Sequence, residues 1–376
     1  MNDICLKTIC VQKKRKSIGL IDSGVNFNHC DLDESTTSFL HIDDQGQRSS
    51  KTSHDTSYHG TFNASLLCGK SNDVKIKAIT PNSKLYVCGA IEGLNLAKNI
   101  LEALEWMLEQ PIQILLMPFG MKGTSPLFSS FLQRFVDKGI LRIAAIGNEG
   151  AGKFRAPGFY SNVLSVGASN NEGIIAPFSG SYNSENTECI KPDIVTDGVD
   201  IESPFKKIGL QSGTSMAATI LAGHAARLWQ AKPSATNHDI YNAIMFTATP
   251  NKKGQEHRCK HGIFNFEKAE QYIKTGTTIN KHQLVEQSFT KYVDPYLIQE
   301  SKYVPISKLF EFIIILKANT SNKYLEGAFP KLEILKKYNN NNIIIVSGNK
   351  EIIEQLVDDV RIKLIQSTEV PFFSFD

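Results

Sequence analysis

Four polar residues, far apart in the chain, are of types that together could carry out acyl transfer. Ser215 follows Gly213-Thr214 and opens an apolar, helix-forming run, SMAATILAG. A hydroxyl at the start of a helix is either a cap or a nucleophile held at the positive end of the helix dipole. His59, in the stretch Tyr-His-Gly-Thr, is of the type that could take the proton from such a hydroxyl near neutral pH.

Asp22 and Asn148 are of the other two types that this chemistry needs. Asp22 ends the apolar run SIGLID, and a carboxylate there could fix the tautomer of His59 and stabilise its imidazolium form. Asn148 follows the apolar run ILRIAAIG, and its amide, with the backbone N–H of Ser215, could donate to the oxyanion of a tetrahedral intermediate. Taken alone, each residue has a common structural explanation, such as a helix cap for Ser215 or Asp22.

Together and in this order, these residues and their surroundings resemble the subtilisin-like (peptidase S8) family of serine peptidases. The similar stretches, spread over residues 17–273 in family order, are DSGV, HGT, AAIGNEG, NVLSVGA, KPDIV, SGTSMAA and HGIFNFEKA. The resemblance implies that Asp22, His59 and Ser215 form the catalytic triad and that Asn148 is the oxyanion donor. It also implies a central parallel sheet flanked by helices.

The resemblance further implies where a peptide would bind. An extended substrate would pair as an added strand between the backbone near Gly93 and the backbone of residues 118–120. Pro118-Phe119-Gly120-Met121 stands where the family usually reads Ser-Leu-Gly-Gly, and proline is tolerated at such an edge. The substrate-binding residues implied in this way are Gly93, Pro118, Phe119, Gly120, Ala145, Gly147 and Arg155.

Arg155 falls where the family places a small residue at the base of its specificity pocket. A guanidinium there would favour Asp or Glu before the scissile bond, because it binds carboxylates through charge-assisted hydrogen bonds. Glu149 would oppose this preference from the rim, and an ordinary surface arginine is the alternative. Shortly afterwards, Ala156–Pro157 matches a cis peptide of the family.

Thr219 stands where the family usually has proline, in GTSMA-x-P. Proline suits a first helical turn because its missing N–H would be unpaired there in any case. The substitution removes no catalytic group. It is either neutral, or it alters how the acyl-enzyme partitions between water and an amine.

Short apolar runs alternate with helical patterns over residues 1–275, which we predict to be the catalytic domain. Near-continuous apolar strands between helices are typical of a parallel sheet covered on both faces, an α/β fold. The expected strands are 17–22, 84–91, 112–120, 140–150 and 162–169, with helices over 95–110 and 125–139. Asp22 and Asn148 then lie beyond the carboxyl ends of strands, where such sheets bind ligands.

A polar linker is predicted over residues 276–300, followed by a small α+β (split βαβ) unit over 301–376. The pattern of this unit is similar to the inhibitory propeptide domain of the same family, and Asp22 comes too early to leave room for such a domain before it. An unrelated α/β appendage is the alternative. If the resemblance holds, the tail 371–376 would lie in the cleft, with Asp376 in the first specificity pocket near Ser215.

The bulk composition narrows the remaining possibilities. A net charge of +3 argues against nucleic acid as the main partner, and we expect neither a signal peptide nor a membrane-spanning segment. Seven scattered cysteines indicate a reducing, cytoplasmic setting. No cofactor is expected, although calcium is possible at Asp31 and residues 72–76. His257, Cys259 and His261 lack an apparent fourth ligand for zinc.

The leading interpretation is an intracellular serine endopeptidase that processes a peptide or protein precursor through an acyl-enzyme. A second hypothesis is a peptide ligase or macrocyclase, in which an amine captures the same acyl-enzyme. A third is a peptide-binding protein without catalysis, against which the complete triad argues.

Overall fold

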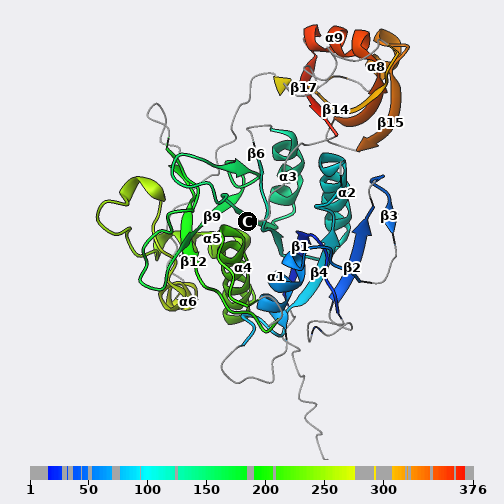
Figure 1. Cartoon of the computed structure of the whole chain (residues 1–376). Coiled ribbons are helices and arrows are strands. Elements are labelled where there is room, and N and C mark those ends of the chain that lie inside the picture. Colours follow the sequence, from blue (N-terminus) through cyan, green and yellow to red (C-terminus); the bar gives the residue numbers. More distant parts are fainter. Residues whose placement is uncertain are drawn as a thin grey trace, which may run out of the picture.

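The computed structural model contains an eight-stranded sheet at the centre of the N-terminal unit, which the sequence predicts to be the catalytic domain (Figure 1). The structure describes residues 16–27, 32, 37–43, 45–49, 53–69, 77–93, 95–122, 126–183, 190–205, 209–275, 292–293, 307–317, 320, 323–338, 342–359 and 361–368. The strand order is β12-β9-β7-β5-β1-β4-β2-β3, and every neighbouring pair is parallel except β2 and β3. The expected α/β fold is confirmed.

The strands of this sheet include all five that the sequence predicts and three that it does not. The bounds are β1 Ser17–Asp22, β2 Thr37–Ile42, β3 Arg48–Ser49, β4 Lys84–Gly89, β5 Ile114–Met117, β7 Leu141–Ala145, β9 Leu164–Ser169 and β12 Ile194–Asp197. Two short antiparallel pairs lie outside it: β6 Met121–Lys122 with β8 Arg155–Ala156, and β10 Tyr182–Asn183 with β11 Ile190–Lys191.

Helices cover both faces of the sheet because successive strand residues point to opposite sides. Ile18 and Leu20 of β1 pack in a cluster with α1 and α4, whereas Ile21 packs in a second cluster with α2 and α3. The helices of this domain are α1 His59–Cys68, α2 Leu96–Glu109, α3 Leu127–Asp137, α4 Thr214–Ala231, α5 Asn237–Phe246 and α6 Phe266–Thr275, with a short 3₁₀ helix at Glu256–Arg258.

Three adjacent parallel strands end at the same edge of the sheet. β1 ends in Asp22, its neighbour β5 ends just before Pro118, and the next strand β7 ends at Ala145, two residues before Gly147. Parallel pairing therefore gathers residues that are far apart in the sequence at one crevice beyond the carboxyl ends.

The C-terminal unit is a five-stranded sheet in the order β13-β17-β14-β16-β15, with two helices on one face. Its elements are β13 Tyr292–Val293, β14 Phe310–Leu316, α8 Lys323–Ala328, β15 Glu333–Tyr338, β16 Ile343–Gly348, α9 Lys350–Asp358 and β17 Ile362–Ser367. β13 comes from the predicted linker and pairs in parallel with β17.

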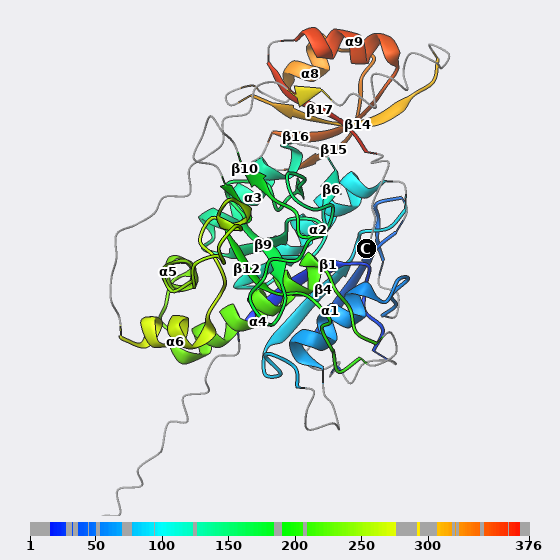
Figure 2. The ribbon, with the colours of Figure 1, turned by 60° about the vertical axis from the view of Figure 1, so that its left-hand side comes forward.

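Both faces of β14 are buried, which explains its continuous apolar run. Phe312, Ile314 and Leu316 pack with α8 and α9. Ile313 and Ile315 point the other way and join the cluster that includes α2 and α3. The C-terminal unit is thus docked on the N-terminal unit through its sheet, as both views show (Figures 1 and 2).

A buried carboxylate lies in this interface. Glu102 on α2 is 2% exposed and accepts a 2.6 Å hydrogen bond from the Tyr338 hydroxyl of β15. Lys336 on the same strand also pairs with Glu102. One turn earlier on α2, Lys98 Nζ lies 3.1 Å from the Glu311 carboxylate of β14. Since a buried charge is costly unless it is paired, the contacts of Glu102 help to specify how the C-terminal sheet packs on α2.

The described residues also test what the sequence predicts about cysteines, a cis peptide bond and membrane-spanning helices. The described cysteines Cys68, Cys88 and Cys259 are free and buried, and burial raises the pKa of the Cys68 and Cys259 thiols to about 12. The Ala156–Pro157 bond is cis, as expected, and so is Lys191–Pro192. None of the described helices combines the length and apolar character needed to cross a bilayer.

The docked arrangement predicts a specific stability effect at Ile313. Ile313→Ala should lower the free energy of unfolding by about 2–5 kcal/mol, because it leaves a cavity between the C-terminal sheet and α2–α3. Leu309→Ala, at a side chain that is 62% exposed, is the control and should change it by about 0.5 kcal/mol or less. Urea unfolding measures both, and equal stability of the two variants would contradict the docking.

Candidate active site

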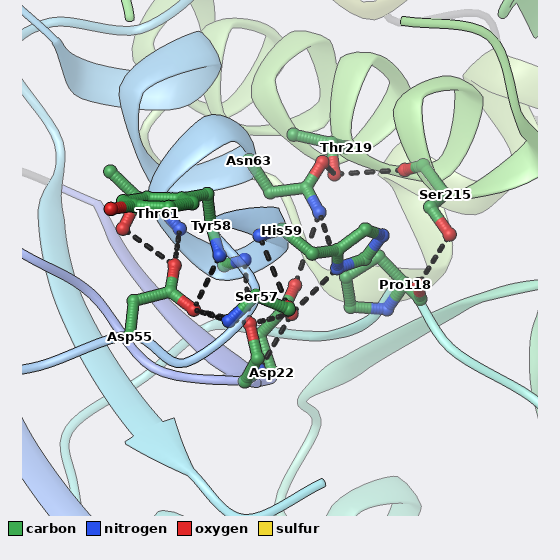
Figure 3. Close-up of polar contacts among 12 residues, drawn as sticks. Asp22, Asp55, Ser57, Tyr58, His59, Thr61, Asn63, Pro118, Ser215 and Thr219 are labelled. Carbon is green, nitrogen blue, oxygen red and sulfur yellow. Dashed lines mark hydrogen bonds and ion pairs between the residues drawn. The ribbon is translucent and has the colours of Figure 1, made fainter. Parts of the chain in front are cut away.

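The carboxylate of Asp22 and the imidazole of His59 meet at the crevice, where β1 ends and α1 begins. Asp22 Oδ1 lies 2.6 Å from His59 Nδ1 (Figure 3). Asp22 is fully buried, and only 9% of the His59 side chain is exposed. A carboxylate can only accept at this contact, so the His59 proton is assigned to Nδ1 and leaves Nε2 as the basic atom.

Two glycines allow β1 and α1 to approach this closely. A Cβ on Gly60 would lie 2.0 Å from the carbonyl oxygen of Gly24, and a Cβ on Gly24 would lie 2.1 Å from that of His54. Gly24 also has φ +130, a conformation that other residues rarely adopt. The glycines of DSGV and HGT are therefore needed to place His59 against Asp22.

The electrostatics of the site favour a protonated His59. Burial is the largest single influence and lowers the pKa, but the charge and hydrogen bond of Asp22, with the charge of Asp55, outweigh it and raise the pKa above the ordinary 6.5. Asp22 therefore stabilises the imidazolium form that proton acceptance would produce.

Asp55 fixes the start of α1 and was not singled out from the sequence. Its Oδ2 accepts from the backbone N–H of Thr61 at 2.6 Å, and its Oδ1 from the N–H of Tyr58 at 3.0 Å. The Ser23 hydroxyl also donates to Asp55, at 2.7 Å. A carboxylate four residues before a His-Gly pair that starts a helix is the sequence signal, since acidic side chains favour helix N-termini.

Ser215 lies in the first turn of α4 and is 8% exposed. Its hydroxyl donates to the carbonyl oxygen of Pro118 at 2.5 Å, so it does not donate to His59 in this structure (Figure 3). Its backbone N–H belongs to the first helical turn, where N–H groups lack a partner within the helix. The structure thus brings Asp22 and His59 into direct contact and leaves Ser215 turned toward the expected substrate edge.

Asn148 is anchored by a residue that sequence reasoning missed. Its Oδ1 accepts from both the N–H and the hydroxyl of Thr214, each at 2.9 Å. The Thr214 hydroxyl in turn accepts from the N–H of Gly147 at 3.2 Å. This anchoring leaves the amide nitrogen of Asn148 as the group able to donate to an oxyanion. Its position directly before Ser215 was the available signal for Thr214.

The short β6–β8 pair brings Arg155 alongside the expected substrate edge. The Arg155 side chain is buried, donates to the Gly120 carbonyl at 3.0 Å and passes so close to Gly147 that a Cβ there would lie 2.9 Å from it. It also forms an ion pair with Glu149, whose pKa is lowered because the pull of Arg155 outweighs the raising effect of burial. The alternative of a surface arginine is therefore wrong.

The other implied substrate-binding residues differ in what they present. Gly93 has φ +81, and Ala145 is the last residue of β7. Phe119 is 4% exposed and its side chain packs in the cluster with α2 and α3.

Some sequence predictions lie outside the described residues. These are the calcium ligands at Asp31 and residues 72–76 and the tail 371–376. Within the part of the chain that is described, His, Cys, Asp and Glu side chains do not gather in threes as a metal site would require.

Comparisons with known proteins place these features in a family. The sequence model described as the subtilase family, peptidase S8, matches residues 13–262. The Alkaline protease of Alkalihalobacillus alcalophilus is 31% identical over 260 residues, which are 67% of this chain and 65% of that protein. Subtilisin Savinase of Lederbergia lenta is 31% identical over 260 residues, 67% of this chain and 92% of that protein. The match thus spans slightly less than two thirds of the first protein.

Solved structures share the fold. The prenylagaramide maturation protease PagA superposes with a TM-score of 0.57 at 24% identity, covering 70% of this chain and 94% of that one. The protease domain of PatA gives 0.57 at 20% identity, covering 70% and 96%.

The environment of His59 predicts how it titrates. Its imidazole should have a pKa above 6.5, whereas burial, aided by Arg227, lowers the pKa of His224 to about 4. At pH 5.5 His59 should therefore be charged and His224 neutral. Titration of the imidazole proton resonances measures both, and Asp22→Asn should lower the value for His59 alone. A pKa for His59 below 6.5 in the unmodified protein would contradict the assigned contact.

Proposed function

This chain belongs to the subtilase family, and on that premise we propose that it is a serine endopeptidase whose catalytic triad is Asp22, His59 and Ser215. The observation that carries the proposal is the 2.6 Å contact of His59 with a fully buried Asp22, at the crevice where the first turn of α4 presents Ser215. That arrangement provides an oriented base beside a hydroxyl at a helix N-terminus.

Catalysis would begin when the Ser215 hydroxyl turns from Pro118 to His59. The oxygen attacks the scissile carbonyl carbon while its proton passes to Nε2 of His59, and Asp22 stabilises the imidazolium. The Asn148 amide and the N–H of Ser215 donate to the oxyanion. Collapse breaks the C–N bond, His59 returns the proton to the leaving amine, and an ester on Ser215 remains. Water, deprotonated by His59, then attacks the ester carbonyl, and the C–O bond to Ser215 breaks to release the carboxylic acid.

Substrate binding would itself release the nucleophile. An extended peptide paired along residues 118–120 places an N–H within reach of a backbone carbonyl of that edge. The Pro118 carbonyl holds the Ser215 hydroxyl at 2.5 Å, so a substrate N–H at that carbonyl competes with it. The freed hydroxyl then has His59 as its acceptor.

The Arg155–Glu149 pair would set the preference for the residue before the scissile bond. Gly120 and Gly147 flank the expected pocket, and the Arg155 side chain lies between these two glycines. Its charge is already matched by Glu149, so an acidic substrate residue must share the guanidinium with that carboxylate. We expect Asp or Glu to be preferred, by a margin that Glu149 reduces.

The C-terminal unit would inhibit the enzyme in cis and confine it to limited processing of a peptide or protein precursor. Its last described residue, Thr368, donates to the Glu311 carbonyl at 3.0 Å, and Glu311 pairs with Lys98 in the first turn of α2. Gly93 at the expected substrate edge shortly precedes that helix. The eight residues 369–376 can reach about 26 Å when extended, at about 3.3 Å each. A tethered tail also acts at high effective concentration.

A cytoplasmic location is part of the proposal, with a peptide or protein as the substrate. The buried free thiols of Cys68, Cys88 and Cys259 support a reducing compartment.

Removing the nucleophile or the oxyanion donor tests the assignment. Ser215→Ala should abolish peptide cleavage while leaving the thermal midpoint nearly unchanged, because it removes only one hydroxyl. Asn148→Ala should lower kcat/KM by about 10²–10³-fold through kcat. The masses of the products also separate hydrolysis from ligation to an added amine. Activity like that of the unmodified enzyme in either variant would refute the assignment.

Deleting residues 371–376 tests inhibition by the tail. The shortened enzyme should cleave a short peptide with a clearly higher kcat/KM, since the cleft no longer has a tethered competitor. A tail of equal length made of Gly and Ser controls for chain length and should behave like the deletion.

The shortened enzyme also reports on Arg155. It should prefer Asp over Asn before the scissile bond by about tenfold, because that is roughly what one hydrogen bond to a charged group contributes. Arg155→Met should remove this preference. An unchanged kcat/KM after deletion would refute inhibition by the tail, and an Asp/Asn ratio unaffected by Arg155→Met would refute the specificity assignment.

A further inference from the structure

A second pair of polar side chains lies one helical turn behind the triad. Asn63 follows His59 by four residues on α1, and Thr219 follows Ser215 by four residues on α4. Both side chains are fully buried, and α1 and α4 pack against each other in one core cluster. Figure 3 shows the pair between Asp22 and the start of α4.

We propose that Asn63 and Thr219 are positioning residues that hold the Asp22 carboxylate in its catalytic orientation and couple it to the helix that carries Ser215. The inference rests on the proposed function, because it concerns the same triad. It assigns roles to two residues that make no contact with the substrate in the mechanism above.

The two oxygens of Asp22 have different partners. Oδ1 accepts from His59 Nδ1 at 2.6 Å and from the backbone N–H of Ser23 at 2.7 Å. Oδ2 accepts from Asn63 Nδ2 at 3.1 Å. Rotation of the carboxylate would break the Asn63 contact, and an apolar side chain at position 63 would leave a fully buried anionic oxygen without this donor.

The chemistry of the groups fixes which atoms donate and which accept in these contacts. The carboxylate only accepts, so the NH₂ end of the Asn63 amide must face Asp22. Its Oδ1 then faces Thr219, whose hydroxyl must donate across the 3.0 Å between them. The same hydroxyl lies 2.9 Å from the carbonyl oxygen of Ser215 and shares its proton with it. A reversed amide would set two acceptors, Asn63 Oδ1 and Asp22 Oδ2, against each other.

This chain of contacts connects both ends of the triad. It runs from the Ser215 carbonyl through Thr219 and Asn63 to Asp22 and His59. Proline, which the family usually has at position 219, offers no hydroxyl. Thr219 and Asn63 therefore act as a unit. The Thr219 hydroxyl acts on the triad only through the Asn63 amide oxygen that accepts its hydrogen bond, and this hydrogen bond helps to hold the amide in its orientation.

The amide also bears on the charge of His59. Asn63 Nδ2 lies 3.3 Å from His59 Nδ1, and both atoms carry hydrogens, so the contact disfavours added positive charge on the ring. The charged groups that act on His59 are Asp22 on β1 and Asp55 before α1, and substitutions at positions 63 and 219 change neither. Removing the amide should therefore raise the pKa of His59.

Kinetics of single and double variants test the proposal. Asn63→Leu should lower kcat/KM for a short peptide by tenfold or more, through kcat, and should move the acidic limb of the pH profile upward. Thr219→Val, nearly equal in shape, should lower it by about tenfold. The double variant should be no slower than Asn63→Leu alone, because the hydroxyl acts through the amide. Thr219→Ser should recover most of what Thr219→Val loses.

Matched controls separate positioning from stability. Thr37→Val removes another buried hydroxyl, on β2, and should leave kcat/KM unchanged. The proposal would be overturned if the double variant lost kcat/KM by the product of the two single-variant losses, or if the acidic limb of the pH profile did not shift in Asn63→Leu. So would unaltered activity of Thr219→Val, or failure of Thr219→Ser to recover it. Ser215→Ala separates the test of the triad from the test of the positioning role. If Ser215→Ala is inactive but the Asn63 and Thr219 variants do not behave as expected, only the positioning role is refuted.

Discussion

The 2.6 Å contact between His59 and a carboxylate without solvent exposure constrains most of the catalytic domain. A buried anion is costly unless it is fully hydrogen-bonded, so the chain supplies the Ser23 N–H, the His59 ring and the Asn63 amide to the two oxygens of Asp22. The approach of α1 to the end of β1 then requires glycine at Gly24 and Gly60. Several of the sequence features around the site follow from this one contact.

The same edge of the sheet organises the remainder of the site. Because β1, β5 and β7 are adjacent and parallel, the residues that follow them meet where α4 begins, which places Pro118 and Asn148 beside Ser215. On the opposite face from α4, α2 and α3 carry the C-terminal sheet, whose β14 is buried on both sides. The central sheet and the helices on its two faces thus position both the proposed catalytic groups and the C-terminal unit. The proposed inhibition in cis uses this C-terminal unit.

The elements with strong apolar patterning could be predicted from the sequence, and weakly patterned ones could not. β1, β4, β5, β7 and β9 lie in near-continuous apolar runs, whereas β2 mixes partly exposed residues and β12 combines two apolar residues with Thr196 and Asp197. Asn63 could not be singled out because it is one of several small polar residues in α1, and nothing distinguishes it until its partner on α4 is known. The opposition of Glu149 to Arg155 was expected from the sequence, but the burial of Arg155 depends on the β6–β8 pairing, which is too short to be recognised. The orientation of the Ser215 hydroxyl toward Pro118 depends on contacts that only coordinates reveal.

The central claim is that Ser215 is a nucleophile activated by His59 and Asp22. The most direct measurement is covalent labelling with a fluorophosphonate, followed by peptide mapping in a mass spectrometer. We predict one label per chain, on Ser215, with labelling nearly abolished in a folded His59→Ala variant. Labelling at another residue, or equal labelling rates with and without His59, would contradict the account.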